Sequence, residues 1–275
     1  MIEVSVIVPF ARKNETRLNA LKQMLDCIKA QDLRVHNTDI KNWEFIFVEQ
    51  ISSDNPNFNV TDMTKGIADN HTLVTYDGPF NKSWCMNVGA RMAQGEWLVF
   101  FDADMLFGKE YLYYAYTWKK SQPIRFFVGW DTIIKLPGKD EPIARLLRNT
   151  ILTAGGAFWC RKDFYWSVGG MNENFFGYGG EDNDFWARVN LLIGKNKHRN
   201  NVTHCPYPMV HVYHDDSVPS PERFYHLDRT VEHPEEVTKR LVNASLGKMK
   251  APTVVDVSDL TVKVSISDSK SMGII

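Results

Sequence analysis

The chain has 275 residues, of which 44% are hydrophobic, 12% aromatic and 24% charged. This composition is that of an ordinary globular protein, and it excludes collagen-like, coiled-coil and intrinsically disordered chains. The 32 lysines and arginines nearly balance the 33 aspartates and glutamates, so the formal net charge is −1. The sequence therefore lacks the basic excess of a dedicated nucleic-acid-binding protein.

The sequence shows no pattern of a membrane-spanning segment or a secretion signal. Its longest apolar runs, at 4–10 and 97–101, are far shorter than the roughly 20 residues that cross a bilayer. The N-terminus enters an apolar run without the basic region of a signal peptide. The four cysteines lie at least 45 residues apart, which offers neither a CxxC zinc pair nor a dense disulfide framework. We therefore expect a reduced, cytoplasmic protein.

Apolar runs and amphipathic segments alternate in the first part of the chain. Residues 4–8 form a short apolar run that we expect to end as a strand at Pro9. The elements expected next are a helix at 18–30, strands at 43–48 and 73–76, a helix at 84–92 and a strand at 97–101. This alternation predicts an α/β fold with a mostly parallel central sheet flanked by helices, in which ligands bind beyond the carboxyl ends of the strands.

The second part of the chain is more mixed. Strands are expected at 126–130 and 157–160, and helices at 182–192 and 230–246, the last interrupted by Pro234. The tail alternates apolar and polar residues with period two at 254–257 and 260–266. That alternation predicts an appended strand or hairpin, to which no chemistry can be assigned.

A DxD motif, Asp102-Ala103-Asp104, follows directly on the apolar run at 97–101. A turn there can bring both carboxylates toward one ion. Carboxylate oxygens suit Mg²⁺ or Mn²⁺, and such an ion can hold a nucleotide diphosphate. A solvated turn is the alternative, because aspartate is common in turns. The position at the carboxyl end of a strand favours the metal interpretation.

A glycine-rich segment, Gly177-Tyr178-Gly179-Gly180, leads into Glu181-Asp182-Asn183-Asp184. The glycines permit backbone shapes and close approaches that other residues forbid. They deliver Glu181 and Asp182 to the start of an expected helix, where a carboxylate can act as general base toward a hydroxyl or interact with the helix dipole. Capping acids alone do not explain the glycines, which favours a functional site.

Two histidines lie three residues apart in His211-Val212-Tyr213-His214. Imidazole binds Mn²⁺ alongside carboxylates, so a loop can present either ring to an ion, and hydrogen-bonded structural histidines are the alternative. The sequence contains neither GxxxxGK[ST] nor GxGxxG, which argues against P-loop and Rossmann nucleotide sites.

Taken together and in this order, the segments resemble the GT-A glycosyltransferases of the galactosyltransferase-like branch, which includes β-1,4-galactosyltransferases and the bacterial chondroitin-polymerase type. The resemblance runs from residue 4 to about residue 224 and is carried by 6–10, 47–50, 80–82, 87–89, 102–104, 155–156, 169–172, 177–184 and 208–214. It implies a GT-A domain at 1–225, with a nucleotide-binding half at about 1–105 and a catalytic half at about 106–225. A C-terminal extension would follow at 226–275.

The resemblance also implies an activity: a metal-dependent, inverting transfer of a sugar from a UDP-sugar to a hydroxyl acceptor such as a glycan. Asp182 and Glu181 would be the catalytic acids, with Asp182 as general base. Mn²⁺ or Mg²⁺ would be held by Asp104 and His214, with Asp102 and His211 as further candidates. The implied nucleotide-sugar contacts are Pro9, Phe10, Arg12, Glu49, Lys82, Asp102 and Ala103, and the implied sugar or acceptor contacts are Tyr178, Gly155, Gly156, Gly179 and Gly180.

Three other functions stay open. The first is a glycosyltransferase whose acceptor is a hydroxymethylated nucleic-acid base, as in a phage-type DNA modification. A compact bacterial or phage enzyme would suit this function. The net charge near zero argues against that polyanionic acceptor, and a strong salt dependence of binding would reveal it. A non-catalytic carbohydrate-binding protein is disfavoured because the acids of the motifs are present. A metal-dependent hydrolase of nucleotide sugars would release UDP without an acceptor.

Overall fold

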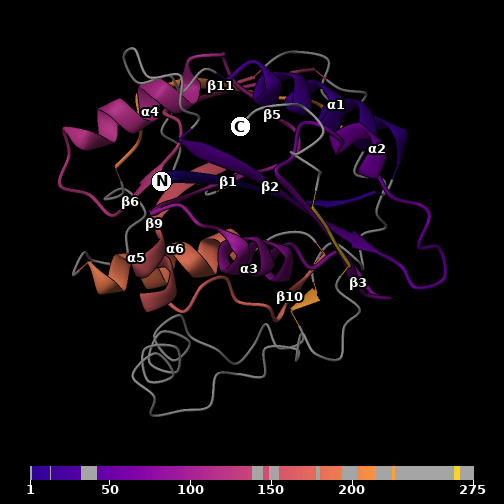
Figure 1. Ribbon diagram of the computed structural model, residues 1–275. Helices are drawn as coiled ribbons and strands as arrows, with labels where there is room; N and C mark the ends of the chain where they lie inside the picture. The colour runs from indigo at the N-terminus through magenta and orange to yellow at the C-terminus, as the bar shows by residue number, and fades with distance from the viewer. Residues whose placement is uncertain are drawn as a thin grey trace, which may run out of the picture.

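The computed structural model describes residues 2–12, 14–31, 42–137, 145–148, 155–177, 180–193, 203–214, 225–226 and 263–266. A central sheet with the strand order β13-β3-β2-β1-β4-β9-β6 lies between two layers of helices (Figure 1). Its strands are β1 (Val4–Ala11), β2 (Trp43–Ile51), β3 (Asn70–Thr75), β4 (Trp97–Phe101), β6 (Phe126–Val128), β9 (Ala157–Arg161) and β13 (Lys263–Ile266).

The sheet is mostly parallel, as predicted. Strand β1 pairs in parallel with β2 and β4, and β2 pairs in parallel with β3. Strand β9 runs antiparallel to both β4 and β6, so β6 points the same way as β4, and β9 and β13 are reversed. One face is covered by α1 (Glu15–Lys29), α2 (Thr61–Thr64) and α4 (Tyr111–Lys120), and the other by α3 (Lys82–Met92), α5 (Lys162–Ser167) and α6 (Glu181–Leu192) (Figure 1).

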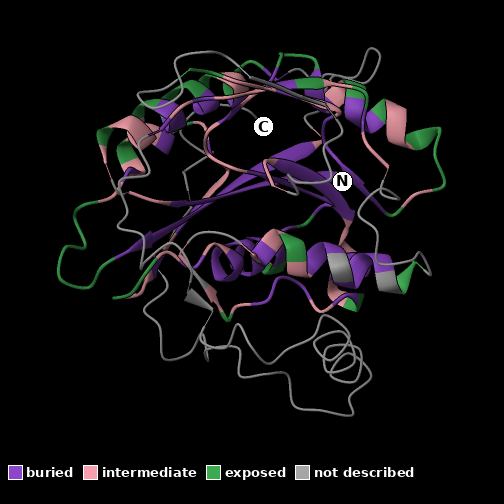
Figure 2. Cartoon of the chain, turned by 180° about the vertical axis from the view of Figure 1, so that it is seen from behind, coloured by how far each residue is buried: buried purple, intermediate pink, exposed green. Residues whose placement is uncertain are grey.

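Because helices cover both faces, the central strands are mostly apolar and are buried along their length rather than on alternate residues. Every residue of β2 and β4 is buried, and Figure 2 shows the exposed residues of the helices on their outer sides. Helix α3 lies close to β1, and a side chain at Gly89 would collide with Ile7. Glycine is therefore needed where this helix meets the sheet.

Most of the expected elements are confirmed within a few residues. The segments expected at 18–30, 84–92, 126–130 and 182–192 are α1, α3, β6 and α6, and those expected at 43–48, 73–76, 97–101 and 157–160 are β2, β3, β4 and β9. The prediction that the first strand ends at Pro9 is wrong, because β1 continues to Ala11. Strand β4 pairs only with the first four residues of β1. The later residues of β1, Pro9 among them, are therefore not paired with β4. A proline, which has no N–H, is tolerated at such an edge.

A second sheet has the order β5-β11-β7-β8, and its strands are β5 (Met105–Leu106), β7 (Thr132–Lys135), β8 (Arg145–Arg148) and β11 (Pro208–His211). In addition, β10 (Phe175–Phe176) pairs with β12 (Tyr225–His226). The antiparallel pairing of β11 with β5 places His211 opposite Met105. A late segment of the chain is thereby brought to the residues that follow β4.

The C-terminal predictions are met only in part. Strand β13 falls within 260–266 and pairs antiparallel with β3, which confirms an appended strand. The helix expected at 230–246 and the alternating run at 254–257 lie outside the described residues. The division into a domain at 1–225 and an extension at 226–275 stays a prediction, as does the cytoplasmic location.

Two findings concern the cysteines and the helices of the described part of the chain. Its four cysteines all lie in the described part and are free thiols. Within that same part, no helix combines the length and the apolar character that crossing a bilayer requires.

Candidate active site

The turn that follows β4 is fixed by the loop before β9. The backbone N–H of Asp102 donates to the carbonyl of Gly156 over 2.9 Å, and the N–H of Gly156 donates to Oδ2 of Asp102 over 3.0 Å. A Cβ atom on Gly155 would lie 2.7 Å from Oδ2 of Asp182 and 3.5 Å from Oδ2 of Asp102. Glycine at this position leaves the space in which the two acids face one another.

Lys82, the first residue of α3, links the end of β4 to the start of α6. Its Nζ atom lies 2.7 Å from Oδ1 of Asp102, 3.3 Å from Oε1 of Glu181 and 3.4 Å from Oδ2 of Asp182. The side chains of Lys82, Glu181 and Asp182 are 15%, 11% and 17% exposed, so the group is largely buried. We call these four residues (Lys82, Asp102, Glu181 and Asp182) the lysine cluster.

The position of Lys82 is fixed by the residue before it. Oδ1 of Asn81 accepts a hydrogen bond from the N–H of Trp84 over 2.9 Å and thereby caps α3. The amide group of Asn81 also donates to the carbonyl of Glu173 over 2.8 Å, and that of Asn87 donates to Oε1 of Glu173 over 2.6 Å. Helix α3 is therefore tied to the loop that leads into α6.

The start of α6 is anchored by a buried arginine. Arg188 has no exposed surface, and its Nε and Nη2 atoms donate to Oδ2 of Asp184 over 2.9 and 2.6 Å. Its Nη1 atom donates to two carbonyls in the turn after α5, those of Val168 and Gly170. The guanidinium group thus holds the first turn of α6, which carries Glu181 and Asp182, against the end of α5.

The glycine-rich segment before α6 is described in part. Gly180 has a φ of 95°, a backbone conformation that residues with a side chain rarely adopt. A Cβ atom at this position would also lie 2.9 Å from the ring of Phe175. Only glycine fits at this position. Tyr178 and Gly179, expected as sugar contacts, lie outside the described residues.

The lysine cluster buries three carboxylates with one ammonium group, and this environment raises the pKa of Asp182 to about 7. Burial is the largest cause; the charges of Glu181 and Asp102 act in the same direction, and Lys82 opposes them. Burial lowers the pKa of Lys82, but the three carboxylates outweigh this and hold it well above its usual value. Lys82 is therefore charged at neutral pH. Asp182 titrates in the same pH range, as is expected of a general base.

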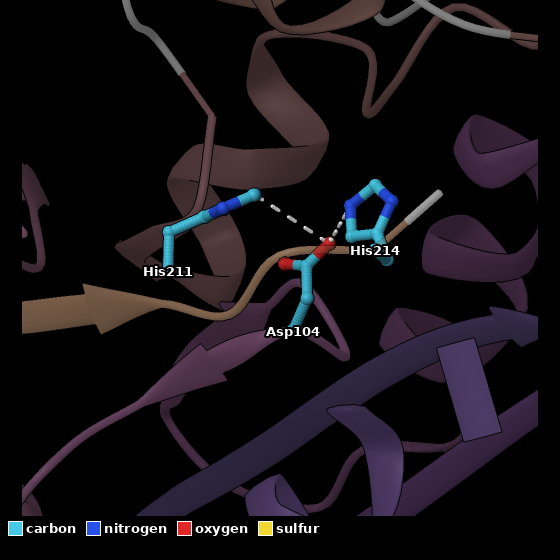
Figure 3. A group of neighbouring side chains, drawn as sticks. All are labelled: Asp104, His211 and His214. Carbon is cyan, nitrogen blue, oxygen red and sulfur yellow. Dashed lines mark ion pairs between the residues drawn. The ribbon is translucent and has the colours of Figure 1, made fainter. Parts of the chain in front are cut away.

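A second group of side chains surrounds Asp104. The Nε2 atom of His214 lies 2.7 Å from Oδ2 of Asp104, and Nε2 of His211 lies 3.7 Å from the same oxygen (Figure 3). The N–H of Val212 donates to the carbonyl of Asp104 over 2.9 Å, which fixes the loop that carries both histidines. We call these three residues (Asp104, His211 and His214) the histidine cluster.

The histidine cluster fits a divalent cation. One ligand atom from each residue lies within 4.8 Å of the others, and a carboxylate with two imidazoles suits Mn²⁺. Oδ1 of Asp104 is buried and has no hydrogen-bond partner among the described residues, an arrangement that a bound cation would satisfy. Burial would raise the pKa of Asp104, but the hydrogen bond from His214 and the nearby charges hold it well below its usual range. The carboxylate is therefore ionised.

Three expected nucleotide contacts, Pro9, Phe10 and Glu49, are buried at the ends of β1 and β2. Pro9 and Phe10 are buried in β1. Glu49 is fully buried; both of its carboxylate oxygens accept from the N–H of Val60, and Oε2 lies 3.2 Å from Nε2 of His71. The structure brings together Lys82, Asp102, Glu181 and Asp182, with Gly155 and Gly156 beside them, and the expected roles of Pro9, Phe10 and Glu49 at the nucleotide stay predictions.

Arg12 and Ala103 complete the set of expected contacts. Ala103 lies between the two aspartates and packs partly against the core. Arg12 follows β1, where its Nη2 atom lies 3.3 Å from Oε1 of Glu15 and its guanidinium group stacks 3.8 Å from the ring centroid of Phe58.

Sequence reasoning missed two arginines of the site. Arg188 stands four residues after Asp184 on an expected helix, and that spacing was an available signal for a pair. Arg17, in the first turns of α1, contributes a charge that lowers the pKa of Asp104. Nothing in the sequence distinguishes Arg17 from other arginines, because its position depends on how α1 packs near β5.

Comparisons with known proteins match both parts of this site to glycosyltransferase families. The family model described as "Glycosyl transferase family 2" matches residues 5–166. The model described as "N-terminal domain of galactosyltransferase" matches residues 148–215, which include both Glu181-Asp182 and the two histidines of the histidine cluster.

Individual relatives agree with these matches. The chain is 28% identical over 198 residues to chondroitin sulfate N-acetylgalactosaminyltransferase 2 of Mus musculus, and the match covers 65% of this chain but 35% of that protein. Among solved structures, TarS of S. aureus matches with a TM-score of 0.51 and 17% identity, over 90% of this chain and 43% of TarS. The chain thus spans less than half the length of either protein, and the likeness to TarS shows the fold alone.

Proposed function

Because the chain belongs to glycosyl transferase family 2, we propose that it transfers a sugar from a UDP-sugar to a glycan hydroxyl, with inversion at the anomeric carbon and with the help of a divalent cation. The chain is a glycosyltransferase with the GT-A fold and a galactosyltransferase-like second part. Its family implies a nucleotide sugar as donor and a glycan as acceptor.

One observation carries the proposal: the two aspartates of the DxD motif belong to two neighbouring clusters with different chemistry. Asp104 joins two histidines in a set that fits a cation, and Asp102 joins the cluster that contains Asp182. Burial lowers the pKa of His211, and among the charges that act on this ring is that of Asp102, which opposes the lowering, so the two clusters are close enough to interact electrostatically. A donor diphosphate and an acceptor hydroxyl would therefore be bound side by side.

In the proposed reaction, Asp182 takes the proton of the acceptor hydroxyl as its oxygen attacks the anomeric carbon. The new carbon–oxygen bond forms on the face opposite the leaving group, and UDP departs with the electron pair of the broken bond. Gly155 keeps the space beside Oδ2 of Asp182 open. When bound by Asp104, His211 and His214, the cation supplies positive charge for the diphosphate.

The contacts proposed for the donor and acceptor follow from position. Arg12, at the carboxyl end of β1, is our proposed nucleotide contact, and Glu181, next to the base, is our proposed sugar contact. The name of the mouse relative and the galactosyltransferase match lead us to propose UDP-N-acetylgalactosamine or UDP-galactose as the donor.

A thermal-shift panel tests the donor and the cation together. UDP-, GDP-, dTDP- and CMP-sugars are compared with Mn²⁺ and with EDTA. Ligand that binds only the folded state at 100 times its Kd stabilises it by about 2.7 kcal/mol. We expect the melting temperature to rise with UDP-sugars in Mn²⁺ and to stay unchanged in EDTA. A rise with CMP-sugars alone, or one that EDTA leaves intact, would contradict the proposal.

A transfer assay separates the remaining functions. UDP release is measured with and without a glycan acceptor, and we expect the acceptor to raise it. Equal release without acceptor would indicate a nucleotide-sugar hydrolase instead. A nucleic-acid acceptor has no supporting observation among these findings, and we do not propose it.

A further inference from the structure

We propose that Lys82 is a positioning residue, whose ammonium group holds the carboxyl groups of Asp102, Glu181 and Asp182 together and favours the ionised form of Asp182, which is the form that takes a proton. This inference rests on the proposed function and adds a role for Lys82 in the acceptor half of the reaction. The family resemblance implies a nucleotide contact at this position, and the two roles lead to different measurable effects.

The geometry gives the first argument. An ammonium group has three N–H donors, and Nζ of Lys82 lies within 3.4 Å of three separate carboxylates. Each donor therefore has an acidic partner within the protein, and none is left over for a phosphate oxygen. A compact charge with rotatable donors suits three acceptors in different directions, whereas a planar guanidinium group favours one carboxylate held by two bonds.

The backbone around Lys82 gives the second argument. Lys82 directly follows the cap residue Asn81, which is 4% exposed and bonded to both Trp84 and Glu173. These hydrogen bonds hold the backbone at Lys82 in place. Its partners come from the turn after β4 and from the first turn of α6, so the side chain joins two elements that carry the donor-side and acceptor-side acids.

The charge balance gives the third argument. Among the described residues, the charged groups that face Asp182 are Lys82 from α3, Glu181 from α6 and Asp102 from the end of β4. Lys82 is the only cation of the three, and it lowers the pKa of Asp182 while burial and the other two raise it. Without this cation, the buried carboxylates repel one another more strongly, and Asp182 holds its proton to a pH above its present pKa of about 7.

The experiment compares Lys82→Met, which removes the charge, with Lys82→Arg, which keeps it. Lys109→Met is the matched control, because the side chain of Lys109 is 72% exposed and lies 3.7 Å from Glu110. In Lys82→Met, we expect the acidic limb of the kcat profile to move to higher pH by about one unit or more. Activity should recover in part at high pH. Lys82→Arg should move the limb less, and Lys109→Met should not move it.

A second readout does not depend on the donor. Aspartate labelled with ¹³C in its carboxyl group is titrated by NMR in the metal-free protein, and the Asp182 signal is identified by its loss in Asp182→Asn. We expect that signal to titrate at higher pH in Lys82→Met. If wild-type protein transfers no sugar, the proposed function fails, yet this titration still tests the role of Lys82.

Two results would overturn the inference. One is an Asp182 signal that titrates identically in wild type and in folded Lys82→Met. The other is a raised KM for the donor with an unmoved acidic limb, which would make Lys82 a nucleotide contact. Should Lys82→Met melt below the assay temperature, Lys82→Gln takes its place, because glutamine keeps a hydrogen-bond donor without the charge, and the same two results decide.

Discussion

The histidine cluster and the lysine cluster both begin at the turn after β4, but their charges balance differently. In the histidine cluster, one carboxylate faces two imidazole rings, and Oδ2 of Asp104 is close to both. In the lysine cluster, three carboxylates face one ammonium group. The lysine cluster therefore has more carboxylates than cations, whereas the histidine cluster offers two imidazole nitrogens beside one carboxylate.

This difference teaches how one short motif can serve two tasks. A carboxylate with neutral imidazoles attracts a metal ion, because the ion adds the charge that the ligands lack. Burial, together with the neighbouring carboxylates, instead raises the affinity for a proton, and this gives Asp182 the pKa of about 7 that suits a base. Experiments that impair one cluster and leave the other intact test this separation.

The largest effect is expected for Asp182→Asn. Removal of the base should lower the transfer rate by about 10²- to 10⁴-fold, the range of general acid–base catalysis. Mn²⁺ and UDP should still bind, because the histidine cluster is unchanged. The variant should melt no lower than wild type, since it removes one of three crowded negative charges. Rates and melting curves measure these effects.

The control for that variant is Asn183→Ala, because Asn183 is the exposed neighbour of Asp182. It should retain the wild-type rate. Normal turnover by Asp182→Asn, or loss of Mn²⁺ binding in it, would remove the distinction between the clusters.

The next effect is expected for His214→Ala. The loss of a ligand should weaken Mn²⁺ binding by at least the 10- to 100-fold that outer contacts of metal sites are worth. Calorimetric titration with Mn²⁺ in the presence of UDP measures this, with Asp182→Asn as the reference that keeps all three ligands. The titration of Asp182 in the metal-free variant should match wild type. An unchanged affinity for Mn²⁺ would show that the cation binds elsewhere.

Local patterns predict the elements that carry these clusters, but not the clusters themselves. The apolar run of β4 followed by Asp102 indicates a strand end, and the glycines before Glu181 indicate a tight approach to a helix. The contact between His214 and Asp104 depends on the pairing of β11 with β5, a strand of two residues, which is too short to leave a periodic signal. Similarly, the partners of Lys82 lie up to 100 positions away.

Some residue roles also follow from packing alone. Glu49 follows an apolar run in the same way as Asp102, and both were expected at the nucleotide. The structure turns Glu49 inward to the N–H of Val60 and to His71, where no ligand is needed to satisfy it. Which of two such acids faces outward depends on the loop that follows each strand. The conformation of that loop cannot be predicted from a local sequence pattern.

A smaller effect is expected for Gly155→Ala. The added Cβ atom would lie 2.7 Å from Oδ2 of Asp182, so this carboxylate must shift. We expect a loss of about tenfold in kcat, which corresponds to about 1.4 kcal/mol of barrier. Mn²⁺ affinity should be unchanged. The control is the double variant with Asp182→Asn: if alanine acts through the base, it should add little to the loss, because contacting sites are not additive.

The smallest effect is the pH dependence of the wild-type enzyme. Asp182 must be ionised to take a proton, and its pKa is about 7, so kcat should fall by about fivefold between pH 7 and pH 6. Stability should change in the opposite direction. Because the folded pKa lies above the usual 3.8, the folded state binds this proton more tightly than the unfolded state does. This contribution to stability is full below the unfolded pKa and is lost as the pH rises through about 7. Asp182→Asn should abolish that part of the pH dependence of the melting temperature, whereas His214→Ala should keep it. A pH-dependent loss shared equally by both variants would mean that the two clusters titrate as one unit.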